Sequence, residues 1–270
     1  MSRIAHLPHR GVLEISGADR IAFLNGLVSN DVSKTGPGHA VWAALLTPQG
    51  KYLVDFFIIS DGERLLLDMP LAEIPALAQK LRRFKLRSEV EIKDCSDTLR
   101  VFAVWDGVPP HIPLTASDPR LPYAGYRCLS EDEVQSNATA QDYASHRIAL
   151  GLPDGAPDLE PDKTLLLEAG FDELGGVDWE KGCYMGQELT ARTKYRGLIK
   201  RRLVPVSLER PGIPAGTPIM ADGQEAGTLR SSAGALGLAT LRLDALEKTL
   251  SADGAQITPR PPSWMKLAAG

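Results

Sequence analysis

Apolar residues along this chain recur with the period of strands in some segments and with the period of helices in others. The runs Val41 to Leu46 and Tyr52 to Ile59 are apolar almost throughout, and the turn T-P-Q-G-K between them predicts a β-hairpin. Between residues 71 and 84 apolar residues recur every three or four positions, which predicts an amphipathic helix. A second helix is expected from Thr139 to Leu150, ended by Gly151. Further strands are expected at residues 6–15, 64–68, 89–93, 99–105 and 126–129, and a proline-rich loop at 106–122.

The pattern changes after Lys200. Short apolar runs separated by glycine, proline and the turn A-D-G-Q replace the helical pattern, with one helical signal at Leu241 to Lys248. Many short strands joined by tight turns favour a small barrel, against which Trp264 is expected to pack. We therefore predict an α+β protein in two parts: residues 1–200, built of two interleaved α+β subdomains, and a C-terminal β-barrel domain at 201–270.

The most unusual stretch runs from Lys181 to Gly197 and reads K-G-C-Y-M-G-Q-E-L-T-A-R-T-K-Y-R-G. Its first two glycines bracket Cys183 and predict a tight loop. Good helix formers follow, so we expect a short helix that Gly197 ends. The positive end of a helix, Lys181 and the nearby arginines all favour a thiolate. Cys183 is thus a candidate nucleophile, redox group or metal ligand, although a free cysteine is often only a small buried apolar residue.

Two carboxylates are further candidates for a site. Asp55 lies inside the apolar run Y-L-V-D-F-F-I-I, so it must be paired, hydrogen-bonded or facing a cavity. Glu168 follows three leucines in the sequence L-E-A-G. The segment Arg192 to Arg202 is basic and forms a local cationic region in a chain of net charge −4.

Bulk composition narrows the class of protein. The chain has 270 residues and a net charge of −4. A negative net charge does not attract nucleic acid or anionic membranes, so we expect neither as a direct partner. Three cysteines occur without a C-x-x-C pair, which fits a reducing compartment. The first residues lack the apolar core of a signal peptide, and no run is long enough for a transmembrane helix. These features predict a cytoplasmic location.

The motif K-G-C-Y-M-G-Q-E and the residues after it resemble the signature of the YgfZ family of folate-binding proteins. That family includes the mitochondrial assembly factors that help to mature [4Fe–4S] proteins, and it shares its fold with the T-protein (aminomethyltransferase) of the glycine cleavage system. The resemblance implies a T-protein-like fold and a folate-binding accessory protein in iron–sulfur cluster assembly, linked to tRNA modification, rather than an ordinary enzyme.

The resemblance also implies roles for particular residues. Cys183 would be the essential thiol and a ligand of a transient iron–sulfur cluster. Because a cluster needs about four ligands, that cluster must be shared, with an A-type iron–sulfur carrier and client [4Fe–4S] enzymes as the expected partners. Glu168 and Asp55 would bind the pterin of tetrahydrofolate. The remaining folate contacts are expected among Lys181, Tyr184, Gln187, Glu188, Arg192, Lys194, Tyr195 and Arg196.

Two alternatives stay open. The first is a folate-dependent one-carbon transferase of the aminomethyl type. The T-protein pattern G-G-x-x-D-D counts against it, because Lys51 replaces the second glycine here and Val54 replaces the first aspartate. The second is a scaffold that keeps the fold but binds no folate.

Overall fold

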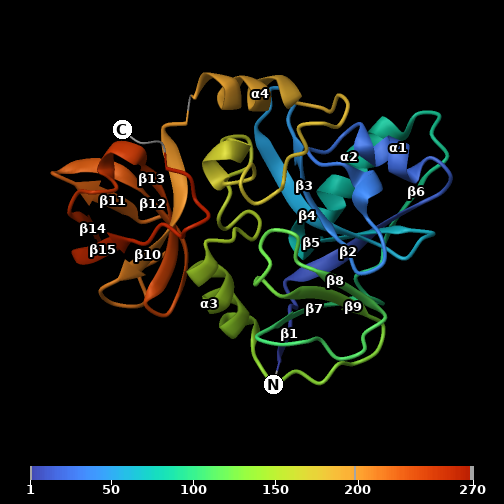
Figure 1. The fold of residues 1–270 in the computed structure, drawn as a ribbon, viewed down its shortest axis with the longest axis horizontal. Coiled ribbons are helices and arrows are strands. Elements are labelled where there is room, and N and C mark those ends of the chain that lie inside the picture. The colour runs from blue at the N-terminus through green and yellow to red at the C-terminus, as the bar shows by residue number, and fades with distance from the viewer. Residues whose placement is uncertain (1, 198, 268–270) are drawn as a thin grey trace.

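Two open antiparallel sheets and one closed barrel make up the computed structural model, which describes residues 2–197 and 199–267 (Figure 1). The five-stranded sheet, ordered β3-β4-β5-β2-β6, consists of β2 (Arg10–Ser16), β3 (Val41–Leu46), β4 (Tyr52–Ser60), β5 (Leu65–Pro70) and β6 (Glu91–Asp94). The four-stranded sheet, ordered β1-β7-β9-β8, consists of β1 (Arg3–His6), β7 (Arg100–Trp105), β8 (Leu114–Ser117) and β9 (Tyr126–Ser130). The barrel, ordered β10-β13-β12-β11-β14-β15, consists of β10 (Arg201–Leu208), β11 (Pro218–Ala221), β12 (Gln224–Ala233), β13 (Leu236–Arg242), β14 (Leu250–Ala252) and β15 (Ala255–Pro259).

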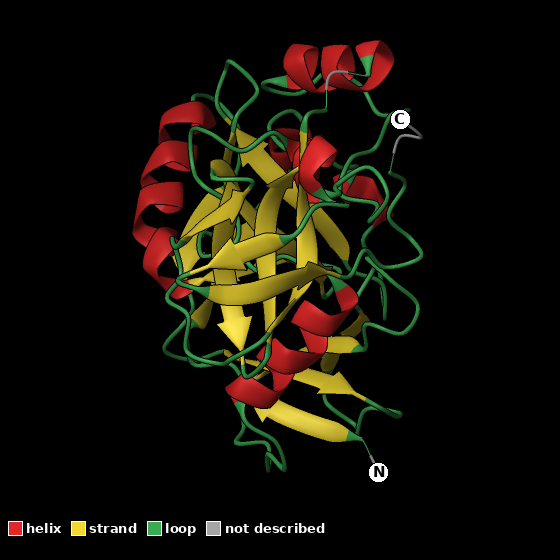
Figure 2. Ribbon diagram, turned by 90° about the vertical axis from the view of Figure 1, so that its left-hand side faces the viewer, coloured by secondary structure: helices red, strands yellow, loops and turns green. Residues whose placement is uncertain are grey.

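Some helices lie at the edge of the molecule and others between the groups of strands (Figure 2). The α-helices are α1 (Arg20–Asn25), α2 (Ile74–Lys85), α3 (Ala140–Leu150) and α4 (Gln187–Arg196). The 3-10 helices are η1 (Val32–Lys34), η2 (Leu71–Glu73), η3 (Leu166–Ala169) and η4 (Leu243–Ala245). Among the described residues, no helix combines the length and apolar character needed to cross a bilayer.

The predicted hairpin of β3 and β4 is confirmed, and its burial explains its continuous apolar sequence. Alternate residues point to opposite faces of a strand. On one face Ala43 and Phe56 join the core beneath α2, and on the other Trp42 and Phe57 join a second core that reaches the barrel. With both faces covered, nearly every position of the hairpin is apolar.

Two local predictions need correction. The strand expected over residues 6–15 is divided in two, because the backbone turns at Leu7 to Arg10 and sends β1 into the other sheet, against β7. The loop expected over residues 106–122 contains β8, a four-residue edge strand that pairs with β9. Prolines at 113 and 119 flank β8 and hide so short a strand in the sequence.

The predicted T-protein-like α+β class and the closed C-terminal barrel are confirmed. The helical signal near residue 241 yields only η4, because β13 continues to Arg242. As expected, Trp264 packs back onto the rest of the chain, where its indole N–H donates a hydrogen bond of 2.9 Å to the carbonyl of Leu150. Figure 1 shows α3 between the barrel and the four-stranded sheet.

A buried ionic cluster lies where the two sheets and the barrel meet, and the sequence pattern did not predict it. Its members come from different elements: Arg10 from β2, Asp68 from β5, Arg127 from β9, Arg147 from α3, and Asp154 and Asp158 from the following loop. The barrel joins it through Ser231, which donates to Asp158. All six charged side chains are buried, so the cluster links the parts of the molecule through charge-assisted hydrogen bonds.

Candidate functional site

The cysteine loop, residues 181–186, is shaped by the close approach of two glycines. Gly186 has a left-handed backbone (φ 81°), and a Cβ there would lie 2.5 Å from the carbonyl oxygen of Thr47. Gly50, also left-handed, would place a Cβ 2.7 Å from the carbonyl oxygen of Gly186. The loop therefore docks on the turn between β3 and β4. Helix α4 follows and ends at Gly197 (φ 60°), as predicted.

Cys183 is exposed on this loop, whereas Cys95 and Cys128 are buried. Burial raises the pKa of the Cys128 thiol to about 11 and also raises that of Cys95, which keeps both thiols protonated. Within the described ranges no group of three or more His, Cys, Asp or Glu side chains is placed to hold a metal ion. Cys183 is thus the one exposed thiol of the three, and the part of the chain that the structure describes offers no cluster of further metal ligands around it.

Lys181 points into the protein. Its ammonium donates hydrogen bonds of 2.7, 2.7 and 2.8 Å to the backbone carbonyls of Asn25, Val28 and Asn30. Burial lowers its pKa to about 8, against the opposing effect of nearby carboxylates. Each N–H of the ammonium has an acceptor within the protein, so this geometry leaves no donor for the predicted folate contact.

Tyr184 and Gln187 also serve the loop itself. The Tyr184 ring is buried in the core shared with the barrel, and burial raises its pKa to about 12. The ring is therefore packed against the protein itself, and its stacking on a ligand stays a prediction. The side-chain oxygen of Gln187 accepts a hydrogen bond of 3.1 Å from the backbone N–H of Tyr184 and closes the turn into α4.

The other predicted residues of α4 lie on its outer face, at the periphery of the molecule in Figures 1 and 2. Glu188 and Arg192 form an exposed ion pair of 2.6 Å, one helical turn apart. Tyr195 is 79% exposed, and Arg196 is exposed beside it. Their contacts with folate stay predictions.

Lys194 faces the protein rather than solvent. Its ammonium lies 3.8 Å from the centroid of the Trp179 ring and forms an ion pair of 3.1 Å with Asp172. The indole N–H of Trp179 donates 2.7 Å to the same carboxylate. Together these three side chains hold α4 against the segment that precedes the cysteine loop.

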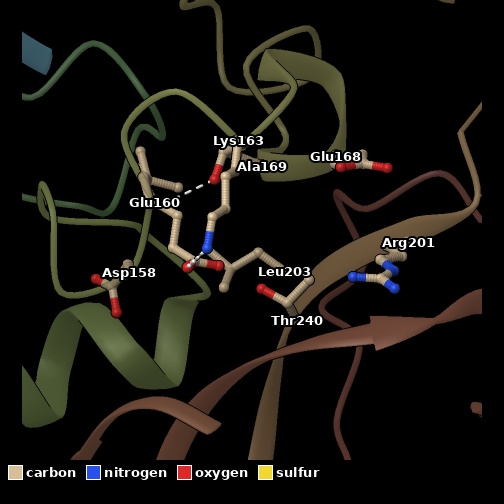
Figure 3. Close-up of a pocket in the computed structure, with 10 residues that line it drawn as sticks. Asp158, Glu160, Lys163, Glu168, Ala169, Arg201, Leu203 and Thr240 are labelled. Carbon is tan, nitrogen blue, oxygen red and sulfur yellow. Dashed lines mark hydrogen bonds and ion pairs between the residues drawn. The ribbon is translucent and has the colours of Figure 1, made fainter. Parts of the chain in front are cut away.

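Glu168 lines an open cavity of about 110 Å³ (Figure 3). The cavity lies between the loop at residues 158–164, η3 and the barrel strands β10 and β13. Burial raises the pKa of Glu168, and the charges of Arg201 and Lys51 and the backbone N–H of Leu165 oppose that rise. The cavity thus holds a half-buried carboxylate that nearby cations attract.

Sequence reasoning missed most of the other polar residues of this cavity. Glu160 pairs with Lys163 at 3.1 Å and, on its other oxygen, with Arg230 at 3.1 Å. Arg201 enters from β10, and α4 supplies none of the described lining residues. In the sequence, only the basic segment Arg192 to Arg202 pointed to Arg201 as a candidate. The sequence could not place Arg201 in this cavity, because nothing local indicates which loop a barrel strand will face.

Asp55 does not line the Glu168 cavity. Its two oxygens accept hydrogen bonds of 2.9 Å from the indole N–H of Trp42 and 2.7 Å from the hydroxyl of Tyr52. The expectation that a buried Asp55 is hydrogen-bonded is confirmed. We expected Asp55 and Glu168 to bind the same pterin. In this structure the Asp55 carboxylate is buried and both of its oxygens are hydrogen-bonded within the protein, so the two carboxylates do not share a cavity.

Comparisons with known proteins identify relatives along nearly the whole chain. The family model described as the CAF17 C-terminal beta-barrel domain matches residues 200–267. The "Iron-sulfur cluster assembly factor IBA57, mitochondrial" of Mus musculus is 32% identical over 97% of this chain and 85% of its own length, and that of Homo sapiens is 31% identical over 96% and 84%. A homologue from Mycosarcoma maydis is 41% identical over 78% of this chain, which spans only 59% of that relative's length.

The solved structure of the glycine cleavage system aminomethyltransferase T from Bartonella henselae has a TM-score of 0.74, covering 98% of this chain and 87% of that one. At 15% identity this likeness shows the fold alone. The relatives' names contradict the prediction of a cytoplasmic location, because each is named as a mitochondrial protein. Those names point to the IBA57 type of assembly factor and mention neither tRNA modification nor folate, so both of these stay predictions.

Proposed function

Because this chain belongs to the family of IBA57-type iron–sulfur cluster assembly factors, we propose that it acts in iron–sulfur cluster assembly and that Cys183 binds a cluster shared with a partner protein. The exposed thiol of Cys183 carries this proposal. A thiol at the surface, just before a helix, can reach a cluster that a second protein holds.

Ligand count supports a shared cluster. A cluster takes about four protein or thiol ligands, and the other two cysteines are buried away from the surface. The cluster is therefore cargo, for which Cys183 supplies one ligand and the partner the others. The expected partners are an A-type iron–sulfur carrier as the donor and [4Fe–4S] enzymes as the clients.

The folate part of the proposal places the pterin of tetrahydrofolate in the Glu168 cavity. A carboxylate can accept two parallel N–H bonds from the amino-pyrimidine edge of a pterin. The half-buried Glu168 suits this role, and Lys51, Lys163 and Arg201 are cations within reach of an anionic glutamate tail. These three residues replace α4 as the expected site of the tail.

We do not propose the one-carbon transferase. The likeness to aminomethyltransferase T is a likeness of fold, and Asp55 is engaged by Trp42 and Tyr52. The accessory role requires only an accessible thiol and a ligand cavity, and the chain has both.

The test is anaerobic mixing of the purified protein with a cluster-loaded A-type carrier, followed by visible absorbance and gel filtration. We expect the wild type and the matched control Cys95→Ser to retain a shared cluster and Cys183→Ser to lose it, with unchanged circular dichroism. A cluster shared equally well by Cys183→Ser would refute the thiol's role. Calorimetric titration of tetrahydrofolate into Glu168→Gln, with the exposed Glu247→Gln of the barrel as control, tests the cavity, and equal affinities would exclude Glu168.

A further inference from the structure

The ammonium of Lys181 is an unusual anchor. It lies two residues before the exposed thiol, yet it points away from it and donates to three backbone carbonyls that converge on one nitrogen. Its charge also lies 5.2 Å from the centroid of the buried Tyr184 ring. Hydrogen bonds from a charged donor are about twice as strong as neutral ones, so this single side chain makes a firm attachment.

The three carbonyls belong to one segment of the N-terminal region. Asn25 is the last residue of α1, and Val28 and Asn30 lie between α1 and η1. The chain before the cysteine loop runs along this same segment. Ser29 donates 2.6 Å to the carbonyl of Gly176, and Asn30 donates 2.7 Å to that of Gly175. The hydrogen bonds of Lys181 are the last contacts of this series before the thiol.

A second anchor follows the thiol immediately. Tyr184 is buried in the core, and Gly186 is held against Thr47. Between the anchors, Gly182 and Cys183 are both exposed, and a Cβ at Gly182 would meet nothing within 4 Å. The thiol therefore lies in an exposed two-residue segment, residues 182–183, which is held by Lys181 on one side and by Tyr184 on the other.

We propose that Lys181 is the positioning residue of the Cys183 thiol, because its ammonium fastens the near end of this two-residue segment to the carbonyls of Asn25, Val28 and Asn30. Its importance for cluster sharing rests on the function proposed above, whereas the fastening itself does not. Arginine cannot replace the lysine, because its planar guanidinium does not direct three donors from one nitrogen. Methionine matches the length but donates nothing.

The first test measures the position of the thiol directly. A nitroxide label will react at Cys183 in the native protein, because the other cysteines are buried. We expect a restricted label spectrum in the wild type and in the control Lys93→Met, an exposed lysine on β6 at the far edge of the five-stranded sheet. In Lys181→Met, which removes all three hydrogen bonds of the ammonium, we expect a mobile label. Backbone exchange at residues 178–184 should be faster by about tenfold or more, which the loss of even one charged hydrogen bond predicts. A restricted label in Lys181→Met would overturn the proposal.

Two further variants distinguish the carbonyl cage from general destabilisation. Lys181→Arg keeps the positive charge but cannot direct three donors from one nitrogen, so we expect its label to be as mobile as that of Lys181→Met. Asp154→Asn lowers stability through the buried ionic cluster and leaves the cage intact, so its label should stay restricted. A restricted label in Lys181→Arg, or a mobile one in Asp154→Asn, would contradict the cage as the cause.

The second test links position to function through cluster sharing with the loaded carrier. We expect Lys181→Met to share the cluster at least about tenfold more weakly than Lys93→Met does. Full sharing by a Lys181→Met protein whose label is mobile would refute the positioning role and leave the proposed function intact. A wild type that shares no cluster would refute the proposed function, while the label still decides whether Lys181 fastens the loop.

Discussion

The indole N–H of Trp42 donates a hydrogen bond of 2.9 Å to the carboxylate of Asp55, which lies diagonally across the β3–β4 hairpin, two residues from Trp42's direct partner Phe57. The ring of Trp42 stacks on Phe171 with centroids 3.9 Å apart, next to η3. The carboxylate thus orients the indole that joins the hairpin to the segment carrying Glu168. Asp55 supports the Glu168 cavity from a distance.

Asp55→Ala is expected to lower the free energy of unfolding by about 2–4 kcal/mol, because the Trp42 N–H and the Tyr52 hydroxyl lose their acceptor. Asp55→Asn keeps one acceptor and should cost about 1 kcal/mol or less. Burial raises the pKa of Asp55, so the folded protein binds this proton more tightly than the unfolded chain does. The stability that comes from this proton is present below the ordinary aspartate pKa and is lost as pH rises through the raised pKa. Urea unfolding at several pH values measures both effects, and equal losses for the two variants would contradict them.

Folate binding is expected to weaken as pH falls through the raised pKa of Glu168. Burial places this pKa above the ordinary value of 4.5, and a protonated carboxyl cannot accept two parallel N–H bonds. The loss should therefore begin at a higher pH than for an exposed glutamate. Calorimetric titration across this range measures it, and Glu168→Gln should bind weakly without this pH dependence. A variant with the same profile as the wild type would assign the titration to another group.

Only Cys183 should react with iodoacetamide in the native protein between pH 7 and pH 9. Burial excludes the reagent from Cys95 and Cys128, and the pKa of about 11 keeps the Cys128 thiol protonated throughout. Mass spectrometry of the intact protein should find one adduct, and three adducts after denaturation in urea. Native modification at Cys128 would mean that the four-stranded sheet opens.

Asp154→Asn is expected to lower the free energy of unfolding by about 3–5 kcal/mol, because it leaves the three buried arginines of the cluster with two carboxylates and one positive charge unbalanced. Asp154 lies 2.5 Å from Arg10 and 3.6 Å from Arg147. These cations hold its pKa well below the ordinary value, so its contribution is present above that value and is lost as pH falls through the lowered one.

Chemical denaturation from neutral pH down to pH 2 measures this loss. The matched control is Asp222→Asn, whose exposed ion pair with Lys248 should change stability by about 0.5 kcal/mol or less. If both variants lost the same small amount, the buried cluster would contribute nothing beyond a surface pair.

The chain's own pattern was sufficient for much of its local structure, although it missed strand β8 and the turn that separates β1 from β2. The hairpin of β3 and β4, helices α2 and α3, the cysteine loop with α4 and the small barrel all followed from apolar period and from glycine placement. These signals act within one element or between adjacent ones, so they can be read along the sequence. The motif also selected Cys183 as the exposed thiol, because glycines beside a cysteine favour a loop over a core.

Tertiary structure alone decided which polar side chains meet. Lys181 points to carbonyls some 150 residues earlier in the chain, where Nζ bonds to Asn25 at a separation of 156 residues. Asp55 turns to Trp42, and Arg201 lines the same cavity as Glu168 because a barrel strand passes η3. A polar residue's role depends on the partner that packing brings to it. The sequence determined the elements and the thiol, and packing between distant elements determined the cavity, the anchors and the buried charges.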